Sequence, residues 1–266
     1  MPKANLGDVE IYYESHGAGE PLLLVPGLGG VGVYWKPNLP ALSAKYRVIV
    51  HDHRGTGQST HSKIKYSVDQ MTDDLVRLMD HLKIESAHLV GHSTGGAIGQ
   101  TLALKSPERL KSMVLFATWT KADFFFRHLF SVRRDLLTKV GKDAYVKGAT
   151  LFLFPPWWIK QNEKMLEERE RLTIEHFPPV EVVASRIDGI VAFDRSAEIG
   201  RIKTPTLVLC AKDDAITPAY FSEELAKKIP GAKLQILPDG GHCASESMAE
   251  EFNNAVLDFL AGANRS

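Results

Sequence analysis

The sequence has few cysteines and no excess of charge of either sign. Only Cys210 and Cys243 are present, which is too few for a disulfide framework. Lysine plus arginine and aspartate plus glutamate each total 32 residues, so the composition predicts neither a nucleic-acid partner nor attraction to an anionic membrane. No apolar run approaches the roughly 18 residues of a membrane helix, and the segment Met1–Asn5 lacks a signal-peptide core. We therefore expect a cytoplasmic protein whose partner is a small-molecule substrate, neutral or only locally charged.

Strand and helix patterns alternate through residues 1–118 and again after residue 200. Apolar runs such as Leu22–Val25 and Ala87–Val90 have the length of buried strands, and Ser67 with Gln70 resembles the capping box of an amphipathic helix. Because parallel strands are joined by crossover helices, the alternation predicts an α/β fold, a mostly parallel central sheet with helices on both faces. The other expected strands are Val9–Glu14, Arg47–Val50, Met113–Phe116, Thr206–Cys210 and Lys233–Leu237, and the other expected helices are Trp35–Ser43, Thr94–Ser106, Phe221–Lys228 and Glu250–Leu260.

Residues 119–200 follow a different pattern, with the aromatic stretch Leu151–Trp158, the charged helix Glu163–Arg171 and no buried-strand signal. We interpret this segment as a helical cap inserted into a core formed by residues 1–118 and 201–266. Its aromatic side chains are candidates for a substrate pocket. A cap also needs a hydrophobic core of its own, so about half of these side chains are equally well explained by packing within the cap. The pocket candidates are Trp119, Phe124, Phe154, Trp157 and Trp158.

A serine between two glycines, Gly91-His92-Ser93-Thr94-Gly95, directly follows a predicted strand and precedes a predicted helix. This arrangement is typical of a nucleophile elbow, in which the serine backbone is strained and glycines avoid collisions with the neighbouring strand and helix. The following helix directs its N-terminal N–H groups toward a developing oxyanion. We interpret Ser93 as a catalytic nucleophile. The alternative is a glycine-serine loop without chemistry.

A serine hydroxyl needs a base, usually histidine, and the histidine needs a carboxylate that fixes its tautomer. His242 lies in a glycine turn after the last predicted strand. Asp214 follows the strand Thr206–Cys210 at its carboxyl end, where the sites of α/β proteins gather. We assign these two residues as base and acid, and Asp213 stays open as an alternative acid.

The order Ser93, Asp214, His242 is that of the α/β-hydrolase fold, which the sequence resembles over nearly its whole length. The segment Pro26-Gly27-Leu28-Gly29-Gly30 resembles the oxyanion loop of that family, with Pro26 in place of the usual histidine. The resemblance implies that the backbone N–H groups of Leu28 and Thr94 bind the oxyanion.

Another family hallmark is the loop Asp52-x-Arg54-Gly55-x-Gly57-x-Ser59, to which we assign an architectural role. Within the superfamily, the sequence most resembles the aminoacrylate hydrolases of pyrimidine breakdown, followed by the 3-oxoadipate enol-lactonases. The elbow serine is not universal among the aminoacrylate-type proteins, so its presence here leaves ordinary ester or lactone hydrolysis open. The resemblance rests on Pro26–Trp35, Asp52–Gly57, Leu151–Pro155, Cys210–Asp214 and Gly240–His242.

Together these motifs predict a cofactor-free serine hydrolase that cleaves a small ester, lactone or amide/carbamate-like substrate through an acyl-enzyme. His51 and His53 have ligand-like spacing, but the sequence offers no third ligand, so no metal is expected. Two alternatives remain: a lyase of the hydroxynitrile-lyase type and a nearly inactive ligand receptor on the same fold. Oligomeric state is also open, with a homo-oligomer among the options.

Overall fold

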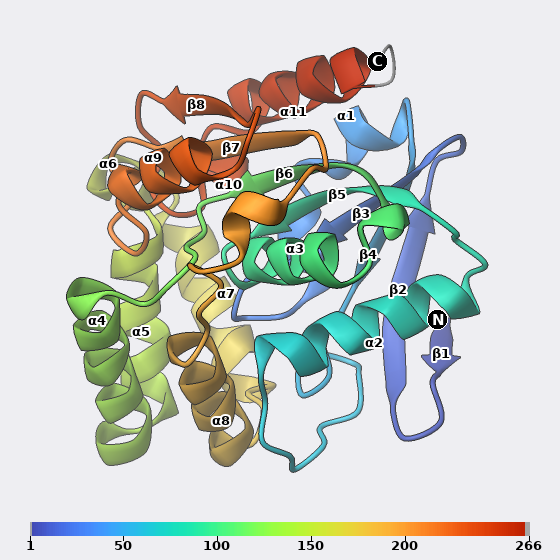
Figure 1. Ribbon diagram of the computed structural model, residues 1–266. Coiled ribbons are helices and arrows are strands. Elements are labelled where there is room, and N and C mark those ends of the chain that lie inside the picture. The colour runs from blue at the N-terminus through green and yellow to red at the C-terminus, as the bar shows by residue number, and fades with distance from the viewer. Residues whose placement is uncertain (1, 264–266) are drawn as a thin grey trace.

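An eight-stranded sheet runs through the centre of the molecule in the computed structural model, which describes residues 2–263 (Figure 1). The strand order is β1-β2-β4-β3-β5-β6-β7-β8; β1 and β2 pair antiparallel, as do β2 and β4, and all the other pairs are parallel. The predicted mostly parallel sheet is therefore confirmed. The strands are β1 Lys3–Asn5, β2 Glu10–His16, β3 Pro21–Val25, β4 Arg47–His51, β5 Ala87–His92, β6 Leu110–Phe116, β7 Thr206–Ala211 and β8 Lys233–Leu237.

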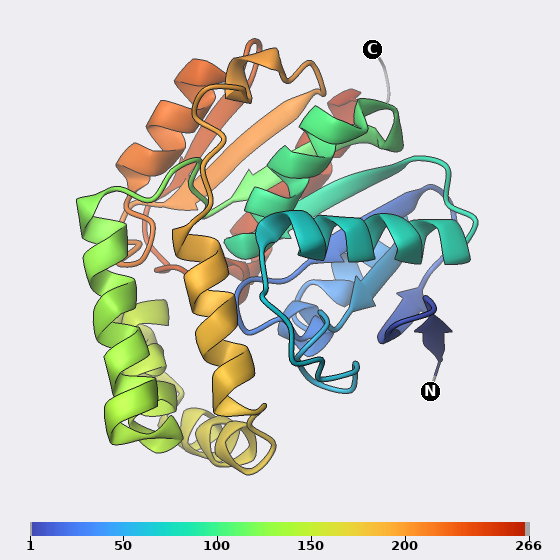
Figure 2. The same ribbon diagram turned by 60° about the horizontal axis from the view of Figure 1, so that its bottom comes forward.

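Helices cover both faces of this sheet (Figures 1 and 2). Successive side chains of a strand point to opposite faces. In β3, Leu23 packs with the helices α2 (Val68–His81) and α3 (Thr94–Lys105), whereas Leu22 and Leu24 pack with α1 (Leu39–Ser43) and α11 (Ala249–Ala263). A buried run such as Leu22–Val25 is thus apolar at every position because both faces are covered. The helices outside the segment between β6 and β7 are α1 Leu39–Ser43, α2 Val68–His81, α3 Thr94–Lys105, α9 Ala219–Lys228, α10 Ala244–Ser247 and α11 Ala249–Ala263, with short 3₁₀ turns at Gly32–Trp35 and Pro107–Arg109; a third 3₁₀ turn, Ile199–Arg201, lies inside that segment just before β7.

The start of α2 follows from its sequence, because the Ser67 side chain accepts a hydrogen bond from the Gln70 N–H at 3.1 Å. The prediction of one continuous helix over Trp35–Ser43 is wrong. The structure has a 3₁₀ turn that ends at Trp35 and a separate α1. Pro37 and Pro40 cannot donate the hydrogen bonds that a continuous helix would need there.

Between β6 and β7 the chain forms a group of helices to one side of the sheet, with no strand among them in this part of the described chain (Figure 2). An isolated bridge between Lys121 and Asp194 brings the two ends of the group together. We call this group the cap; its expected boundaries at residues 119 and 200 stay a prediction. Its elements are α4 Phe124–Asp135, a π-helical turn Leu136–Val140, α5 Lys142–Leu153, α6 Pro156–Gln161, α7 Glu163–Glu175 and α8 Val180–Val191.

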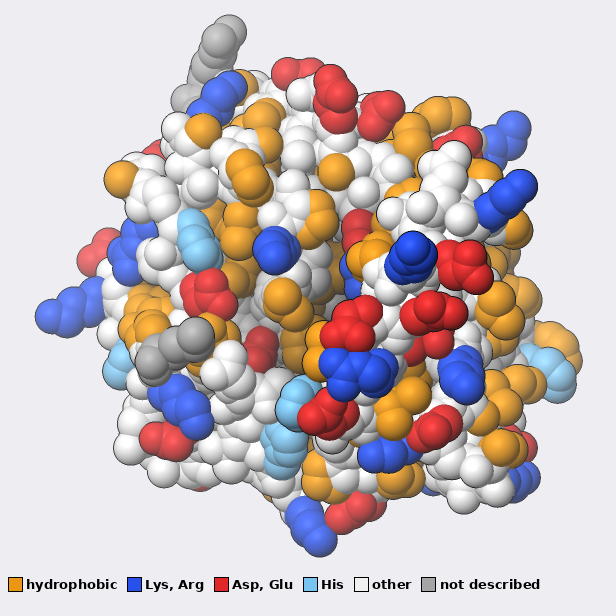
Figure 3. Space-filling view, turned by 180° about the vertical axis from the view of Figure 1, so that it is seen from behind, with side chains coloured by type: hydrophobic (Ala, Val, Ile, Leu, Met, Phe, Trp, Pro, Cys, Tyr) orange, Lys and Arg blue, Asp and Glu red, His pale blue; other side chains and the backbone are white. Residues whose placement is uncertain are grey.

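Acidic and basic side chains are interspersed on the face of the molecule shown in Figure 3, with no broad area of one sign. On α7, Arg171 forms ion pairs with Glu168 and Glu175. In the part of the chain that the structure describes, every helix is too short or too polar to cross a membrane. Residues 2–263 also contain no cluster of three or more histidine, cysteine or acidic side chains that could hold a metal ion.

Candidate active site

Ser93 lies at the sharp turn from β5 into α3, with φ at 53° and ψ at −112°. A positive φ is strained for a residue with a side chain, and here the Ser93 N–H is held by the Phe116 carbonyl oxygen at 2.8 Å. The flanking glycines are required, because a Cβ on Gly95 would lie 2.1 Å from the Val25 carbonyl oxygen and one on Gly91 would lie 2.3 Å from that of Gly95. The predicted elbow geometry is therefore present at Ser93.

His242 lies in the loop after β8, and its Nδ1 is 2.8 Å and 3.0 Å from the two carboxylate oxygens of Asp214, which follows β7. Asp214 also accepts hydrogen bonds from the N–H groups of Ile216 and Thr217, at 2.8 and 2.9 Å, and from the Thr217 hydroxyl at 2.8 Å. These bonds hold the carboxylate in one orientation next to Nδ1 of the imidazole ring. A carboxylate in this position keeps the proton of a neutral histidine on Nδ1 and leaves Nε2 free to accept one.

Asp213, the alternative acid, accepts a hydrogen bond from the Gly241 N–H at 2.8 Å. It therefore supports the loop that carries His242, while Asp214 contacts the ring itself. Two adjacent aspartates thus have different contacts with the same loop.

His92 connects the elbow to this histidine loop. Its Nε2 lies 3.0 Å from the His242 carbonyl oxygen, and its ring stacks on Tyr34 with centroids 4.6 Å apart. A carbonyl oxygen can only accept, so Nε2 carries the ring proton, while Nδ1 is buried and has no hydrogen-bond partner among residues 2–263. Burial, together with the neighbouring His242, holds the pKa of His92 well below its usual range, so the ring is neutral at pH 7.

The segment Gly27–Gly30, which we call the oxyanion turn, packs directly on the elbow. A Cβ on Gly27 would lie 3.2 Å from the Cβ of Ser93, and the Gly30 N–H donates to the Gly27 carbonyl oxygen at 3.0 Å. That oxygen and the Leu28 N–H belong to one planar peptide group and point in opposite directions. The oxyanion turn therefore contacts the elbow at Ser93, and Thr94 begins α3 directly after that serine.

The cap contacts the loop that carries His242. The Cys243 N–H donates to the Leu153 carbonyl oxygen at 3.1 Å, and a Cβ on Gly241 would lie 3.0 Å from Pro155. Arg169 of α7 adds an ion pair to Glu246 of α10, with Nη1 at 2.9 Å from Oε2. The segment that joins α5 to α6 thus lies against the loop of the catalytic base candidate.

The aromatic residues expected in a pocket occupy three environments. Phe154 and Trp158 stack on each other at 4.3 Å and pack with Cys243, the neighbour of His242, and Trp157 beside them is 38% exposed. Trp119 is fully buried against Phe126 and Phe193. Phe124 is 72% exposed and stacks on His128, so its side chain is not part of an enclosed pocket wall.

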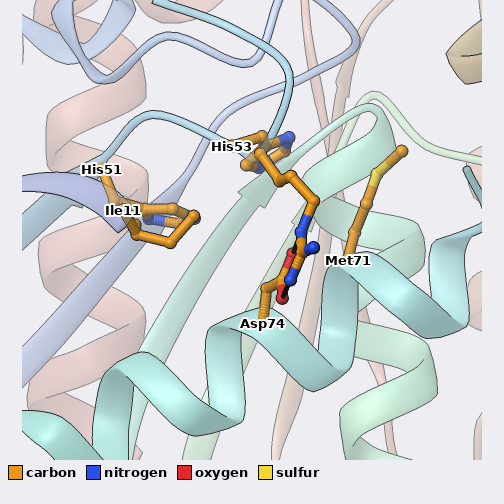
Figure 4. A pocket seen from close by; sticks show the side chains of 6 residues that line it. Ile11, His51, His53, Met71 and Asp74 are labelled. Carbon is orange, nitrogen blue, oxygen red and sulfur yellow. Dashed lines mark hydrogen bonds and ion pairs between the residues drawn. The ribbon is translucent and has the colours of Figure 1, made fainter. Parts of the chain in front are cut away.

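The loop Asp52–Ser59 is architectural, as its sequence indicates. The Asp52 carboxylate accepts from the N–H groups of Gly32 and Gln58 at 2.7 and 2.8 Å, and Arg54 makes two hydrogen bonds to Asp74 of α2, at 2.9 and 2.7 Å. Between the loop, β2 and α2 lies a cavity of about 10 Å³, too small for a substrate. Figure 4 shows its lining, which consists of Ile11, His51, His53, Arg54, Met71 and Asp74.

Comparisons with known proteins agree with this fold. The family described as alpha/beta hydrolase fold matches residues 20–247. Proteins named "Putative carbamate hydrolase RutD" from Azorhizobium caulinodans and Caulobacter sp. (strain K31) are 42% and 40% identical to this chain, over 97% and 95% of it and 98% and 96% of their own lengths. The crystal structure of the enol-lactonase from Burkholderia xenovorans LB400 is similar with a TM-score of 0.90 and 28% identity, covering 98% of this chain and 100% of that one.

These findings confirm the resemblance drawn from the elbow, the oxyanion turn and the cap segment, and they agree with a hydrolase rather than a protein of another class. The family match spans the elbow, the oxyanion turn and both loops that carry Asp214 and His242. The chain is a hydrolase that belongs to the α/β-hydrolase fold family and, within it, to the family of the RutD hydrolases.

Proposed function

We propose that this hydrolase uses Ser93 as nucleophile, His242 as general base and acid, and Asp214 as the residue that orients the histidine. The observation that carries the proposal is the contact of His242 Nδ1 with both carboxylate oxygens of Asp214, within 3.0 Å. The loop that holds His242 is also hydrogen-bonded to His92 of the serine elbow. Among residues 2–263, no other histidine near Ser93 contacts a carboxylate in this way. The Leu28 and Thr94 N–H groups are the proposed oxyanion donors.

In the first half of the reaction the Ser93 hydroxyl oxygen attacks the acyl carbon while His242 Nε2 takes the hydroxyl proton. The resulting oxyanion accepts hydrogen bonds from the N–H groups of Leu28 and Thr94, and Asp214 stabilises the imidazolium. The tetrahedral intermediate then expels an alcohol or amine, which receives the proton from His242. An acyl group remains on Ser93.

In the second half a water molecule attacks the acyl carbon and gives a proton to His242, and Ser93 leaves as the restored hydroxyl. Every step is a transfer of a proton or of an acyl group. The side chains of Ser93, His242 and Asp214 can carry these steps without a metal or cofactor.

We propose a small carbamate or amide as substrate. The two relatives at about 40% identity are named for carbamate hydrolysis, and Ser93, Asp214 and His242 are each no more than 5% exposed, which favours a compact substrate. A small lactone or ester is the second candidate, favoured by the likeness to the enol-lactonase. The proposed pocket wall from the cap is formed by Phe154, Trp157 and Trp158.

The proposal is tested with a panel of small carbamates, amides, lactones and nitrophenyl esters assayed on the wild type beside Ser93→Ala. We expect turnover by the wild type, highest for one small acyl class, and a burst of about one leaving group per chain with an activated ester. A lyase would turn over without any burst, and a receptor would bind without turnover. Circular dichroism of Ser93→Ala controls for folding.

We also propose a cytoplasmic location. Both Cys210 and Cys243 are free and buried, which accords with a reducing compartment. We propose neither a nucleic-acid partner nor a membrane partner. The oligomeric state is open, and size-exclusion chromatography distinguishes a monomer from a homo-oligomer.

A further inference from the structure

Arg186 is a buried arginine of the cap that reaches across to the core. It lies on α8 with only 1% of its surface exposed. Its Nη2 donates to the Leu28 carbonyl oxygen at 3.0 Å, and its Nη1 donates to the Arg54 carbonyl oxygen at 3.0 Å. One side chain from the cap therefore binds both the oxyanion turn and the architectural loop of the core.

The charge of Arg186 has no carboxylate partner within ion-pair distance in residues 2–263. Arg186 also contacts His53, whose Nδ1 accepts from Nη2 at 3.1 Å, and its guanidinium carbon lies 5.7 Å from the centroid of the Tyr66 ring. Burial holds the pKa of His53 well below its usual range, so that ring is neutral, and burial lowers the pKa of Arg186 to about 10, so the guanidinium stays charged at pH 7. A buried cation without a carboxylate partner is costly, so its presence in the cap calls for an explanation.

The position of this cation relative to the oxyanion turn suggests that role. Two successive peptide groups of the turn are fixed by separate donors: the Gly30 N–H holds the Gly27 oxygen, and Arg186 holds the Leu28 oxygen. A Cβ on Gly30 would lie 2.8 Å from Arg186 Nη2, so the guanidinium packs against the turn itself. The peptide groups on both sides of the Leu28 Cα are therefore restrained before any substrate binds, and the Leu28 N–H belongs to the first of them.

We propose that Arg186 is a positioning residue for the oxyanion turn, which presets the Leu28 N–H and adds an uncompensated positive charge beside the developing oxyanion. Donors fixed before the reaction, in a site with little water, stabilise a transition state more than donors that must reorganise. The inference rests on the proposed function, because it requires an oxyanion at Leu28. It also means that the cap supplies part of the electrostatic field of the core site.

The test compares Arg186→Met and Arg186→Lys with the matched control Arg133→Met. Arg133 is also a buried arginine of the cap, but it contacts Phe130 and Tyr145 and does not reach the turn. The readouts are the single-turnover rate of acylation by an activated ester, kcat, KM and the affinity for a boronic acid, whose serine adduct is a tetrahedral anion.

We expect Arg186→Met to lower the acylation rate by about 10²-fold with KM changed less than about threefold, and to weaken boronate binding in parallel. Arg186→Lys should recover part of the rate, because the ammonium keeps the charge but cannot reach both carbonyl oxygens. Arg133→Met should lower the melting temperature and keep the acylation rate within about threefold. If Arg186→Met does not fold, Arg186→Lys decides the question with an expected loss of about tenfold.

A wild-type acylation rate in the Arg186 variants, or a loss no greater than that in Arg133→Met, would overturn the inference. The same conclusion follows if KM rises while boronate affinity and kcat stay constant, because that pattern would mark a substrate contact. If the wild type itself forms no acyl group on Ser93, the proposed function fails first, and the two failures are distinguishable by mass spectrometry of the wild-type adduct.

Discussion

The Nε2–H of His92 donates to the backbone carbonyl oxygen of His242 across 3.0 Å, so the residue before the elbow serine holds the backbone of the proposed base. This bond joins the carboxyl end of β5 to the loop after β8. The relative position of Ser93 and His242 therefore depends on a side chain that does not take part in proton transfer.

His92→Phe tests this dependence, because phenylalanine keeps the stack on Tyr34 but cannot donate to His242. We expect kcat to fall by about tenfold, since misplacement of a catalytic group is costly even when the group is intact. His92→Gln, whose amide can donate, should recover part of the loss. Equal activity of His92→Phe and the wild type would show that the histidine loop holds its position without this bond.

Asp214→Asn should reduce kcat by about 10³–10⁴-fold, because an amide facing Nδ1 favours the wrong imidazole tautomer. Asp213→Asn is the matched control; its side-chain oxygen can still accept from the Gly241 N–H, and we expect a loss of less than about tenfold. Steady-state kinetics on both variants provide the measurement. Similar losses in the two variants would refute the assignment of the acid, and the reverse order would transfer the role to Asp213.

Trp157 and Trp158 of the cap should affect specificity differently. We expect Trp157→Ala to change the ranking of substrates by acyl size, with a loss of roughly 1–3 kcal/mol in transition-state binding for the best one and little change in melting temperature. Trp158→Ala should change the ranking and also destabilise the protein, by roughly 3–5 kcal/mol, because it removes a buried ring that stacks on Phe154. A uniform loss for all substrates would mean that both tryptophans only stabilise the cap.

Acid should destabilise the protein through buried histidines. Burial lowers the pKa of His51 to about 4, below its ordinary 6.5. The contribution of this neutral, buried ring to the free energy of unfolding is therefore complete above pH 6.5 and is lost as the pH falls toward 4. Between pH 7.5 and 5, His51 alone should lower the free energy of unfolding by about 2 kcal/mol.

Urea denaturation of the wild type and His51→Gln at these two pH values measures this contribution. Between pH 7.5 and 5, His51→Gln should lose less free energy of unfolding than the wild type. The control His128→Gln, at an exposed histidine, should lose as much as the wild type. If wild type and His51→Gln lose the same free energy, His51 is not the source of the acid sensitivity.

Features with local causes were predictable from the sequence. The buried strands are unbroken apolar runs, α2 begins at a capping serine, and the elbow requires glycines at fixed positions. The strand Lys3–Asn5 was not predicted, because three residues have no usable periodicity and their structure depends on pairing with β2. The choice between Asp213 and Asp214 could not be made firmly, because neighbouring side chains in a loop point in directions that only the folded backbone determines.

The contacts of Arg186 were also missed, because they join segments more than 130 residues apart. A usable signal was present in the sequence. On α8 the buried face includes Val182, Val183, Ile187 and Ile190, and Arg186 lies within that face at helical spacing. A charged residue inside an apolar stripe calls for a partner elsewhere in the fold.

The most direct test of the central claim is the mass of the enzyme during turnover. After mixing with a slowly hydrolysed aryl carbamate and quenching in acid, the wild type should carry one acyl group per chain, located on Ser93 by peptide fragmentation. Ser93→Ala should carry none and should lose at least about 10³-fold in rate while remaining folded. Absence of the adduct from an active wild type, its location on another residue such as Cys243, or activity of Ser93→Ala within about tenfold of wild type would contradict the account.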